Sequence, residues 1–165
     1  MKRIFVILFT LIALGAQAAP GITTVILVRH AEKATEPANN PPLTAEGQER
    51  AKELARILGN SGITAIFSTN LARTRQTAAP IAKALSIQPA VSAPAATYAR
   101  DIANRIRSTH AGKTVLVVGH TNTTRDVIAA LGVANPPTIS EEEYDNLFIV
   151  TLAEGSEPRL LALKY

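Results

Sequence analysis

The sequence predicts an α/β fold, a three-layer α-β-α sandwich with a mainly parallel central sheet. Two apolar runs, Thr23–His30 and Lys113–His120, are rich in β-branched residues, and each stops at a histidine. Runs of this kind indicate strands buried on both faces, as in parallel sheets. Strand-like runs also alternate with helical patterns along the chain, and 165 residues suit one core and one domain.

The first 18 residues have the pattern of a secretory signal peptide. Lys2 and Arg3 form a positive start, Ile4–Gly15 is mostly apolar, and Ala16-Gln17-Ala18 is a small-x-small cleavage pattern. The apolar stretch is shorter than the roughly 20 residues of a membrane-spanning helix. We therefore expect a signal over 1–18 and an exported, periplasmic domain over 19–165, with no stable membrane anchor after cleavage.

Composition narrows the range of partners. The chain has no cysteine, which excludes disulfides and a lipid-modified N-terminal cysteine. Without Lys2 and Arg3, the 17 basic residues become 15 against 13 acidic ones, and the net charge falls from +4 to +2. That balance is too weak to favour nucleic acid or an anionic membrane surface, so we expect no nucleic-acid partner.

The first half of the domain alternates strands with helices. We expect strands over Ile22–Val28 and Thr64–Ser68, a helix from the N-cap Thr44 to Leu58, and a helix over Leu71–Ala84. The first helix has an apolar stripe formed by Ala51, Leu54, Ala55 and Leu58. Pro80 predicts a kink or a break in the second helix, because proline lacks the backbone N–H that a helix needs.

The second half continues the alternation. The expected elements are a short strand over Gln88–Val91, a helix over Asp101–His110 stopped by Gly112, a strand ending at His120, and a helix over Asn122–Leu131. Leu147–Leu152 and Arg159–Leu163 are expected to form a closing antiparallel pair. The sequence contains no repeat or linker, which favours a single domain.

Arginine and histidine gather where predicted strands end. Arg29-His30 and Gly119-His120 follow two of the strands, and Arg73 lies near the start of the helix after a third. Ligands of open α/β sheets bind at such strand ends. A guanidinium holds two phosphate oxygens, an imidazole can attack phosphorus, and a helix start favours an anion. Each residue alone fits an ordinary loop or capping role, but together they predict a phosphate site.

Four motifs in this order resemble those of the histidine phosphatase superfamily, the phosphoglycerate-mutase-like group. They are Leu27-Val28-Arg29-His30-Ala31-Glu32, Leu43-Thr44-Ala45-Glu46-Gly47, the segment from Ser68 to Ala78 that contains Arg73, and Gly119-His120. The resemblance covers nearly the whole domain. The chain has Ala31 where many members have glycine.

The resemblance implies a phosphoglycerate-mutase-like fold and phosphoryl transfer in two steps, with no metal or other cofactor. His30 would form a phosphohistidine that water then hydrolyses. Arg29, Arg73 and His120 would hold the phosphoryl oxygens, and His120 would also act in catalysis. His30 must attack through an unprotonated nitrogen, so we expect its other ring nitrogen to donate to a backbone carbonyl.

The sequence leaves open which residue is the acid that protonates the leaving group. Asp101 is the one carboxylate between Arg73 and His120, and it fits the first turn of a helix equally well. Glu32 and Asp145 are rivals. Phosphohistidine phosphatases manage without such an acid because imidazole leaves easily, so the substrate class depends on this point.

Two other groups have plainer interpretations. His110 fits the end of its helix, where a cation favours the helix dipole. The run Glu141-Glu142-Glu143 reads as a solvated acidic face, in a loop that could border the pocket.

Three alternatives remain beside the phosphatase. A metal hydrolase built on His30, Glu32 and His120 would leave Arg29 and Arg73 unexplained. A non-catalytic phosphate-binding module would keep the pocket without turnover, and a mutase would need a phosphorylated sugar-acid pool. The short segment from Gln88 to Asp101 predicts an open site for a small-molecule or envelope-linked phosphate ester.

Overall fold

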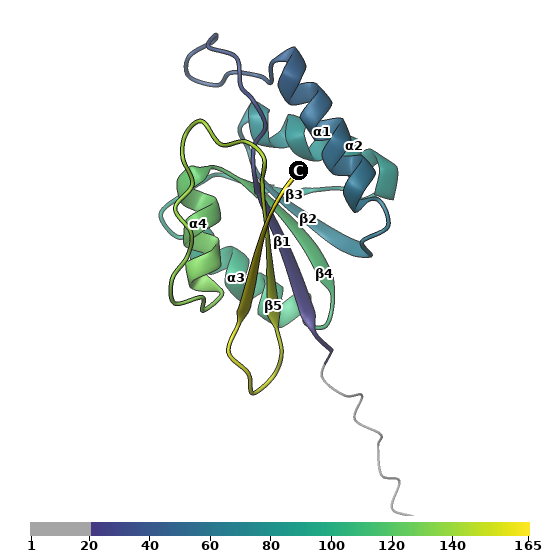
Figure 1. Cartoon of the computed structure of the whole chain (residues 1–165), viewed down its shortest axis with the longest axis vertical. Helices are drawn as coiled ribbons and strands as arrows, with labels where there is room; N and C mark the ends of the chain where they lie inside the picture. The colour runs from purple at the N-terminus through teal and green to yellow at the C-terminus, as the bar shows by residue number, and fades with distance from the viewer. Residues whose placement is uncertain (1–20) are drawn as a thin grey trace, which may run out of the picture.

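Within residues 21–165, which the computed structural model describes, six strands form one sheet and four helices cover its faces (Figure 1). The strands are β1 (Thr23–Arg29), β2 (Ile63–Thr69), β3 (Ala90–Ser92), β4 (Thr114–Gly119), β5 (Asn146–Leu152) and β6 (Arg159–Lys164). The helices are α1 (Ala45–Leu58), α2 (Ala72–Leu85), α3 (Tyr98–Thr109) and α4 (Thr121–Ala130). The predicted signal peptide over 1–18 lies outside the described residues.

The sheet has the order β3-β2-β4-β1-β5-β6. Strands β3, β2, β4 and β1 run parallel, whereas β5 pairs antiparallel with β1, and β6 pairs antiparallel with β5. Helices α1 and α2 lie on one face of the sheet, and α3 and α4 lie on the other (Figure 1). The predicted α/β class, the mainly parallel sheet and the closing antiparallel pair are therefore confirmed.

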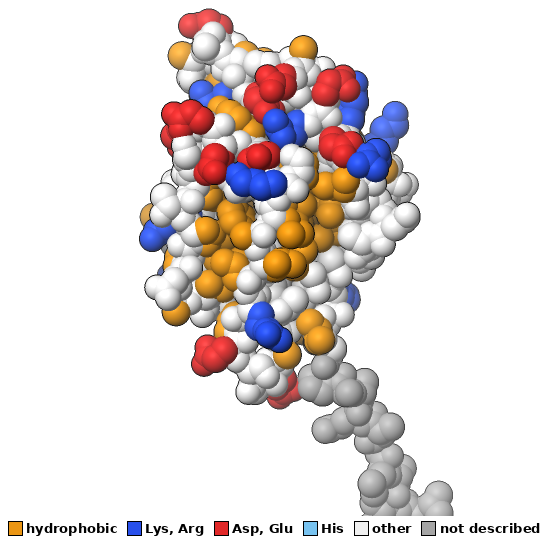
Figure 2. All heavy atoms as spheres, viewed as in Figure 1, with side chains coloured by type: hydrophobic (Ala, Val, Ile, Leu, Met, Phe, Trp, Pro, Cys, Tyr) orange, Lys and Arg blue, Asp and Glu red, His pale blue; other side chains and the backbone are white. Residues whose placement is uncertain are grey.

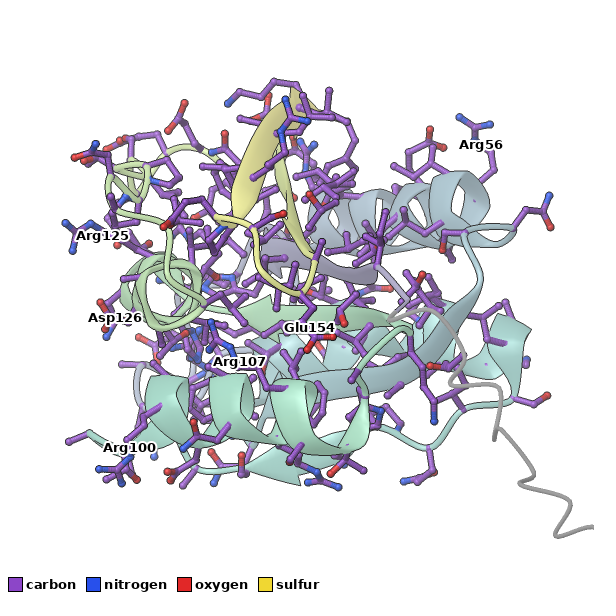
Figure 3. The ribbon with its side chains drawn as sticks, turned by 90° about the horizontal axis from the view of Figure 1, so that it is seen from below. Arg56, Arg100, Arg107, Arg125, Asp126 and Glu154 are labelled. Atoms are coloured by element: carbon purple, nitrogen blue, oxygen red, sulfur yellow. The ribbon has the colours of Figure 1, made fainter. Side chains whose placement is uncertain are left out.

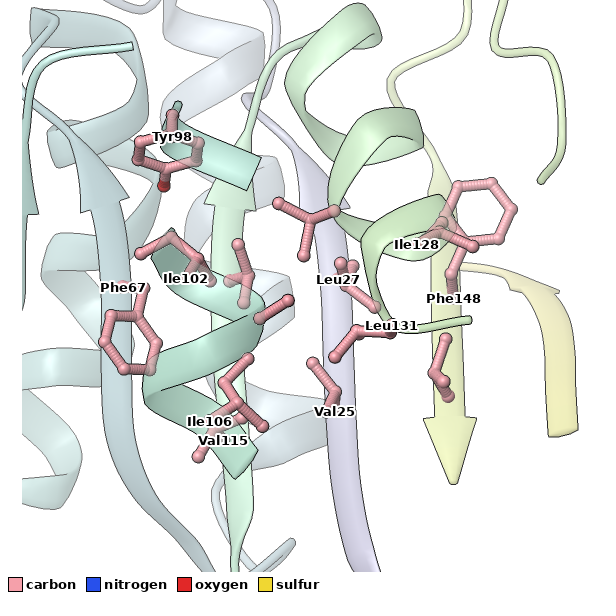
Figure 4. Close-up of a cluster of buried hydrophobic side chains, with 14 of the residues drawn as sticks. Val25, Leu27, Phe67, Tyr98, Ile102, Ile106, Val115, Ile128, Leu131 and Phe148 are labelled. Carbon is pink, nitrogen blue, oxygen red and sulfur yellow. The ribbon is translucent and has the colours of Figure 1, made fainter. Parts of the chain in front are cut away.

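Neighbouring residues of the central strands pack into two separate cores. Val25 and Leu27 of β1 join the cluster under α3 and α4 (Figure 4), whereas Ile26 and Val28 join the cluster under α1 and α2. Side chains alternate between the two faces of a strand, so a strand covered on both sides needs an unbroken apolar run. This arrangement explains the apolar sequence that precedes His30.

Helix α1 begins as predicted. Thr44 is the N-cap, and its hydroxyl accepts a hydrogen bond from the Gly47 N–H at 3.1 Å. Gly47 also lies against the backbone of Glu32, because a Cβ built at Gly47 would overlap the Glu32 carbonyl group. The glycine of this motif therefore lets α1 pack directly on the loop that follows His30.

Helix α2 does not have the break that was one of the two outcomes predicted at Pro80. It runs from Ala72 to Leu85 without a break at Pro80. Ala78 and Ile81, on either side of the proline, are fully buried. Their packing holds the helix together where one backbone hydrogen bond is missing.

Other boundaries differ by a few residues. Helix α3 begins at Tyr98 rather than Asp101, because Tyr98 is buried in the core and extends the apolar face by one turn (Figure 4). Strand β3 covers Ala90–Ser92 rather than Gln88–Val91, and α4 begins one residue before Asn122.

The edge strand β6 exposes apolar side chains. Leu161 and Leu163 of the edge strand β6 are 53% and 44% exposed, and apolar atoms gather over this face of the molecule (Figure 2). The residues described here contain no helix with the length and hydropathy that a membrane crossing requires.

The contact at Gly47 generates a prediction. Replacing Gly47 by Ala should lower the free energy of unfolding by about 2 kcal/mol, because the new methyl group forces α1 away from the Glu32 carbonyl. Urea unfolding measures this change. Gly59→Ala, at the C-cap of α1 with an ordinary helical φ of −57°, is the control. Equal stability of Gly47→Ala and the native chain would contradict the packing role.

Candidate active site

The two histidines at the strand ends lie side by side. Strands β1 and β4 pair in parallel with Arg29 opposite Gly119, and the His30 N–H donates to the Gly119 carbonyl at 2.9 Å. The ring centroids of His30 and His120 are 5.3 Å apart in an edge-on arrangement. Parallel pairing therefore places both imidazoles at the same edge of the sheet, as predicted.

The hydrogen bonds of His30 fix its tautomer. Its Nδ1 lies 2.8 Å from the carbonyl oxygen of Ala31. A carbonyl only accepts, so Nδ1 carries the proton and Nε2 keeps its lone pair. This contact confirms the prediction of a backbone carbonyl behind the ring. Burial lowers the pKa of His30 to about 3 against the opposing effect of the Ala31 hydrogen bond, and the charges of Arg29, His120 and Arg73 lower it further.

His120 is held from the other side by two threonines. Its Nε2 lies 2.9 Å from the Thr69 hydroxyl, which lies 2.7 Å from the Thr74 hydroxyl. The Nδ1 atom of His120 is buried and has no hydrogen-bond partner within residues 21–165. Burial and then the charges of Arg73 and Arg29 lower the pKa of His120 to about 4. Both imidazoles are therefore neutral at pH 7.

Gly119 allows helix α4 to start immediately beside the strand end. A Cβ at this position would lie 2.7 Å from the Thr123 hydroxyl oxygen and 2.9 Å from that of Thr124. The Thr123 hydroxyl in turn accepts a hydrogen bond from the His120 N–H at 2.8 Å. The absence of a side chain at Gly119 therefore leaves room for the first turn of α4.

A cavity of about 590 Å³ opens over these residues. His30, Arg73, His120 and the first residues of α4 are among the groups that line it. Arg73 is half-buried in the first turn of α2, and its Nε has no hydrogen-bond partner in the described chain. Burial and the Arg29 charge lower the pKa of Arg73. The cavity thus combines an arginine, two neutral imidazoles and a helix start, a set of groups that suits an anion.

A second cavity, of about 710 Å³, lies along α2 and β3 and is lined by Arg75 and Lys83 but by neither His30 nor His120. We place the site at the smaller cavity because the predicted residues converge there. Arg75, two residues after Arg73 on the same helix, lines this other cavity.

Arg29 has partners that the sequence did not predict. Its guanidinium is 1% exposed, and Nη1 donates to the carbonyl oxygens of Ser140, Glu141 and Glu143 at 3.0, 2.7 and 3.1 Å. Its Nη2 donates to the Glu141 carboxylate at 2.7 Å. The Tyr144 ring stacks on the guanidinium, with its centroid 4.4 Å from Cζ. Arg29 thus binds the loop before β5 as well as adjoining His30.

The three carboxylates predicted as acid candidates do not line the cavity. Asp101 lies in the first turn of α3, and its exposed carboxylate pairs with Arg100, which projects outward (Figure 3). Glu32 pairs with Arg50 at 2.6 Å, and Asp145 pairs with Lys164 at 2.8 Å. We therefore correct the assignment of Asp101 to the site: its position is that of a first-turn helix residue. The alternative metal site on His30, Glu32 and His120 lacks its carboxylate, because Glu32 pairs with Arg50 and does not line the cavity.

The carboxylates that do line the cavity are Glu141 and Asp126. Asp126 and its neighbour Arg125 project from the outer side of α4 (Figure 3). The sequence indicated only that the glutamate run could border the pocket. Loop contacts between residues 112 positions apart, such as Arg29 with Glu141, leave no local pattern that would have revealed them.

His110 ends α3 as predicted, with its ring packed edge-on against Phe67 at 5.5 Å between centroids. The positive charge expected for His110 at this helix end is not favoured. Burial, Lys113 and Arg105 lower the pKa of His110, so the cationic form that the helix dipole favours is not promoted.

Comparison with known proteins supports the sequence resemblance. Residues 25–96 match the sequence model of the histidine phosphatase superfamily, branch 1. A protein described as probable phosphoglycerate mutase GpmB, from Escherichia coli O1:K1 / APEC, is 42% identical over 66 residues. This match spans 36% of the present chain and 31% of the relative's length.

Solved structures share the fold over most of both chains. The protein histidine phosphatase SixA, complexed with tungstate, has a TM-score of 0.69 at 19% identity and covers 86% of this chain and 96% of its own. A mycobacterial glucosyl-3-phosphoglycerate phosphatase has a TM-score of 0.67 at 16% identity, over 87% of this chain and 98% of its own. Residues 25–96 therefore resemble the histidine phosphatase superfamily in sequence, and the described chain shares its fold with solved histidine phosphatases.

Proposed function

We propose that this protein is a phosphatase that hydrolyses phosphate esters through a phosphohistidine on His30. The observation that carries the proposal is the state of the His30 ring. Its Nδ1 proton is directed at the Ala31 carbonyl at 2.8 Å, so the lone pair of Nε2 is free in a residue that lines the cavity. A neutral, fixed imidazole is the form that can attack phosphorus.

The reaction follows from this geometry in two displacements. The Nε2 lone pair of His30 forms a bond to phosphorus while the bond from phosphorus to the ester oxygen breaks, and the departing oxygen takes a proton from solvent water. Water then attacks phosphorus, the P–N bond breaks, and neutral His30 and inorganic phosphate remain. Arg73 and the start of α4 stabilise the charge on the phosphoryl oxygens in both steps, as phosphoryl transfer requires. The proposal assigns no step to a metal or another cofactor.

A phosphohistidine-type phosphatase is a second candidate. Asp101, Glu32 and Asp145 all lie away from the cavity, which leaves none of the acids expected from the sequence beside the leaving group. Substrates whose leaving group needs little help from an acid, such as phosphohistidine or an aryl phosphate, fit this arrangement. A steep loss of kcat from aryl to alkyl phosphates would favour this candidate.

Export and the substrate belong to the same proposal. The signal pattern over 1–18 supports a periplasmic domain beginning near Ala19, which mass spectrometry of the secreted protein tests. The connection between β3 and α3 is short, from Ser92 to Tyr98, and contributes Pro94 to the cavity lining. This supports an accessible site that takes a small-molecule or envelope-linked phosphate ester.

The first prediction concerns the nucleophile. The chain should release phosphate from an aryl phosphate in excess chelator, and His30→Ala should abolish this activity, because no other group then forms the covalent intermediate. His110→Ala, a histidine outside the cavity, should keep the activity. Activity that persists in His30→Ala or vanishes with chelator would exclude the mechanism. Phosphate binding without turnover would leave a binding module.

The second prediction concerns charge. Arg73→Ala should lower kcat by roughly 10³-fold or more, because an arginine that neutralises the transferring group contributes that much in phosphoryl transfer. Arg75→Ala, which removes the same charge from the same helix outside the cavity, should change kcat by less than about threefold. A loss of under tenfold for Arg73→Ala would remove this residue from the site.

The third prediction concerns pH. An unfolded histidine titrates near 6.5, whereas the folded-state pKa of His30 is about 3. Between these values the unfolded chain binds a proton that the folded chain does not, so the free energy of unfolding should fall as pH drops below 6.5. His30→Asn should weaken this dependence, and the part that remains comes from His120, whose pKa is lowered to about 4. An NMR titration that gives His30 a pKa near 6.5 would contradict the prediction.

A further inference from the structure

We propose that Glu141 is an internal competitor for the phosphoryl group: its carboxylate occupies the side of Arg29 that an incoming phosphate needs. The inference rests on the proposed function, since it assumes that Arg29 binds the phosphoryl oxygens. It concerns the affinity of the site rather than its chemistry.

The guanidinium of Arg29 has two sides with different surroundings. Nη1 donates to three backbone carbonyls of the 140–143 loop, which are fixed neutral partners. On the other side, Nη2 donates to the Glu141 carboxylate at 2.7 Å, and the buried Nε has no hydrogen-bond partner among the described residues. Adjacent N–H groups such as Nε and Nη2 form the fork that holds two oxygens of one phosphate. One N–H of that fork is therefore buried without a partner among the described residues, and a carboxylate holds the other.

Glu141 has the properties of a displaceable group. Its side chain is 69% exposed, whereas the guanidinium it contacts is 1% exposed. Its carboxylate makes one hydrogen bond within residues 21–165, the bond to Arg29. The residue also lines the cavity that holds His30. A carboxylate with one anchor and free access to water can leave without disturbing the Nη1 contacts that hold the loop.

Charge makes simultaneous binding unfavourable. The charge of the Glu141 carboxylate partly opposes the lowering of the pKa values of Arg73 and His120, so its field reaches the groups that would contact phosphate. A phosphate dianion on Arg29 would lie beside this negative charge in a partly buried site, where repulsion is weakly screened. Phosphate must therefore displace the carboxylate from Nη2, and the cost of displacement lowers the affinity of the site.

This cost has a distinctive consequence. It is the same for every anion that uses Arg29, so the competitor weakens substrate and product phosphate by one common factor. A proton donor would affect kcat and leave the binding of inorganic phosphate unchanged. A residue that only holds Arg29 in position would strengthen anion binding, and its loss would weaken the binding of every anion.

Glu141→Gln tests these alternatives, because the amide keeps the size of the side chain and removes the charge. Glu142→Gln is the matched control: it removes an equal charge from the same loop, at a carboxylate that bonds the Ser140 hydroxyl and does not line the cavity. Calorimetry with inorganic phosphate gives Kd without turnover, and steady-state kinetics on an aryl phosphate give KM and kcat. Thermal unfolding of each variant checks the fold.

We expect Glu141→Gln to lower Kd for phosphate and KM for the aryl phosphate by the same factor, roughly 3- to 10-fold, the size of one partly exposed charge-assisted contact. Glu142→Gln should change both by less than about twofold. Unchanged or weaker phosphate binding in Glu141→Gln, with Tm preserved, would overturn the inference alone. No phosphate binding by the native chain would overturn the proposed function itself.

Discussion

The parallel pairing of β1 with β4 is the constraint on which the site depends. Its register sets Arg29 opposite Gly119, and the hydrogen bond from the His30 N–H to the Gly119 carbonyl extends the pairing by one residue. Two imidazoles from positions 90 residues apart thereby meet at 5.3 Å between ring centroids. The apolar cores on both faces of these strands hold the register, because a slip of one residue would turn every buried side chain to the wrong face.

Burying Arg29 imposes a second requirement. A charge that is 1% exposed needs several partners, and the 140–143 loop supplies three carbonyl oxygens and one carboxylate. The arginine therefore organises the loop that forms one wall of the cavity. The same residue connects the fold of the distant segment before β5 with the chemistry beside His30.

The site combines two arginines with two neutral imidazole rings. Burial lowers the pKa of His30 to about 3 and that of His120 to about 4, and the positive charges of Arg29 and Arg73 add to this effect. His30 is thus neutral mainly because it is buried, and its positive neighbours add to this effect. Those neighbours are also the groups that attract a phosphate dianion, so one arrangement serves both needs.

The sequence by itself determined the α/β class, the order of the elements and the meeting of His30 with His120, because apolar periodicity and strand ends are local properties. It also predicted the carbonyl behind His30. The path of α2 through Pro80, the position of Asp101 outside the cavity and the contact of Arg29 with Glu141 were decided by the tertiary structure alone. Each of these depends on packing between segments far apart in the chain, and such contacts leave no trace in a local pattern of residues.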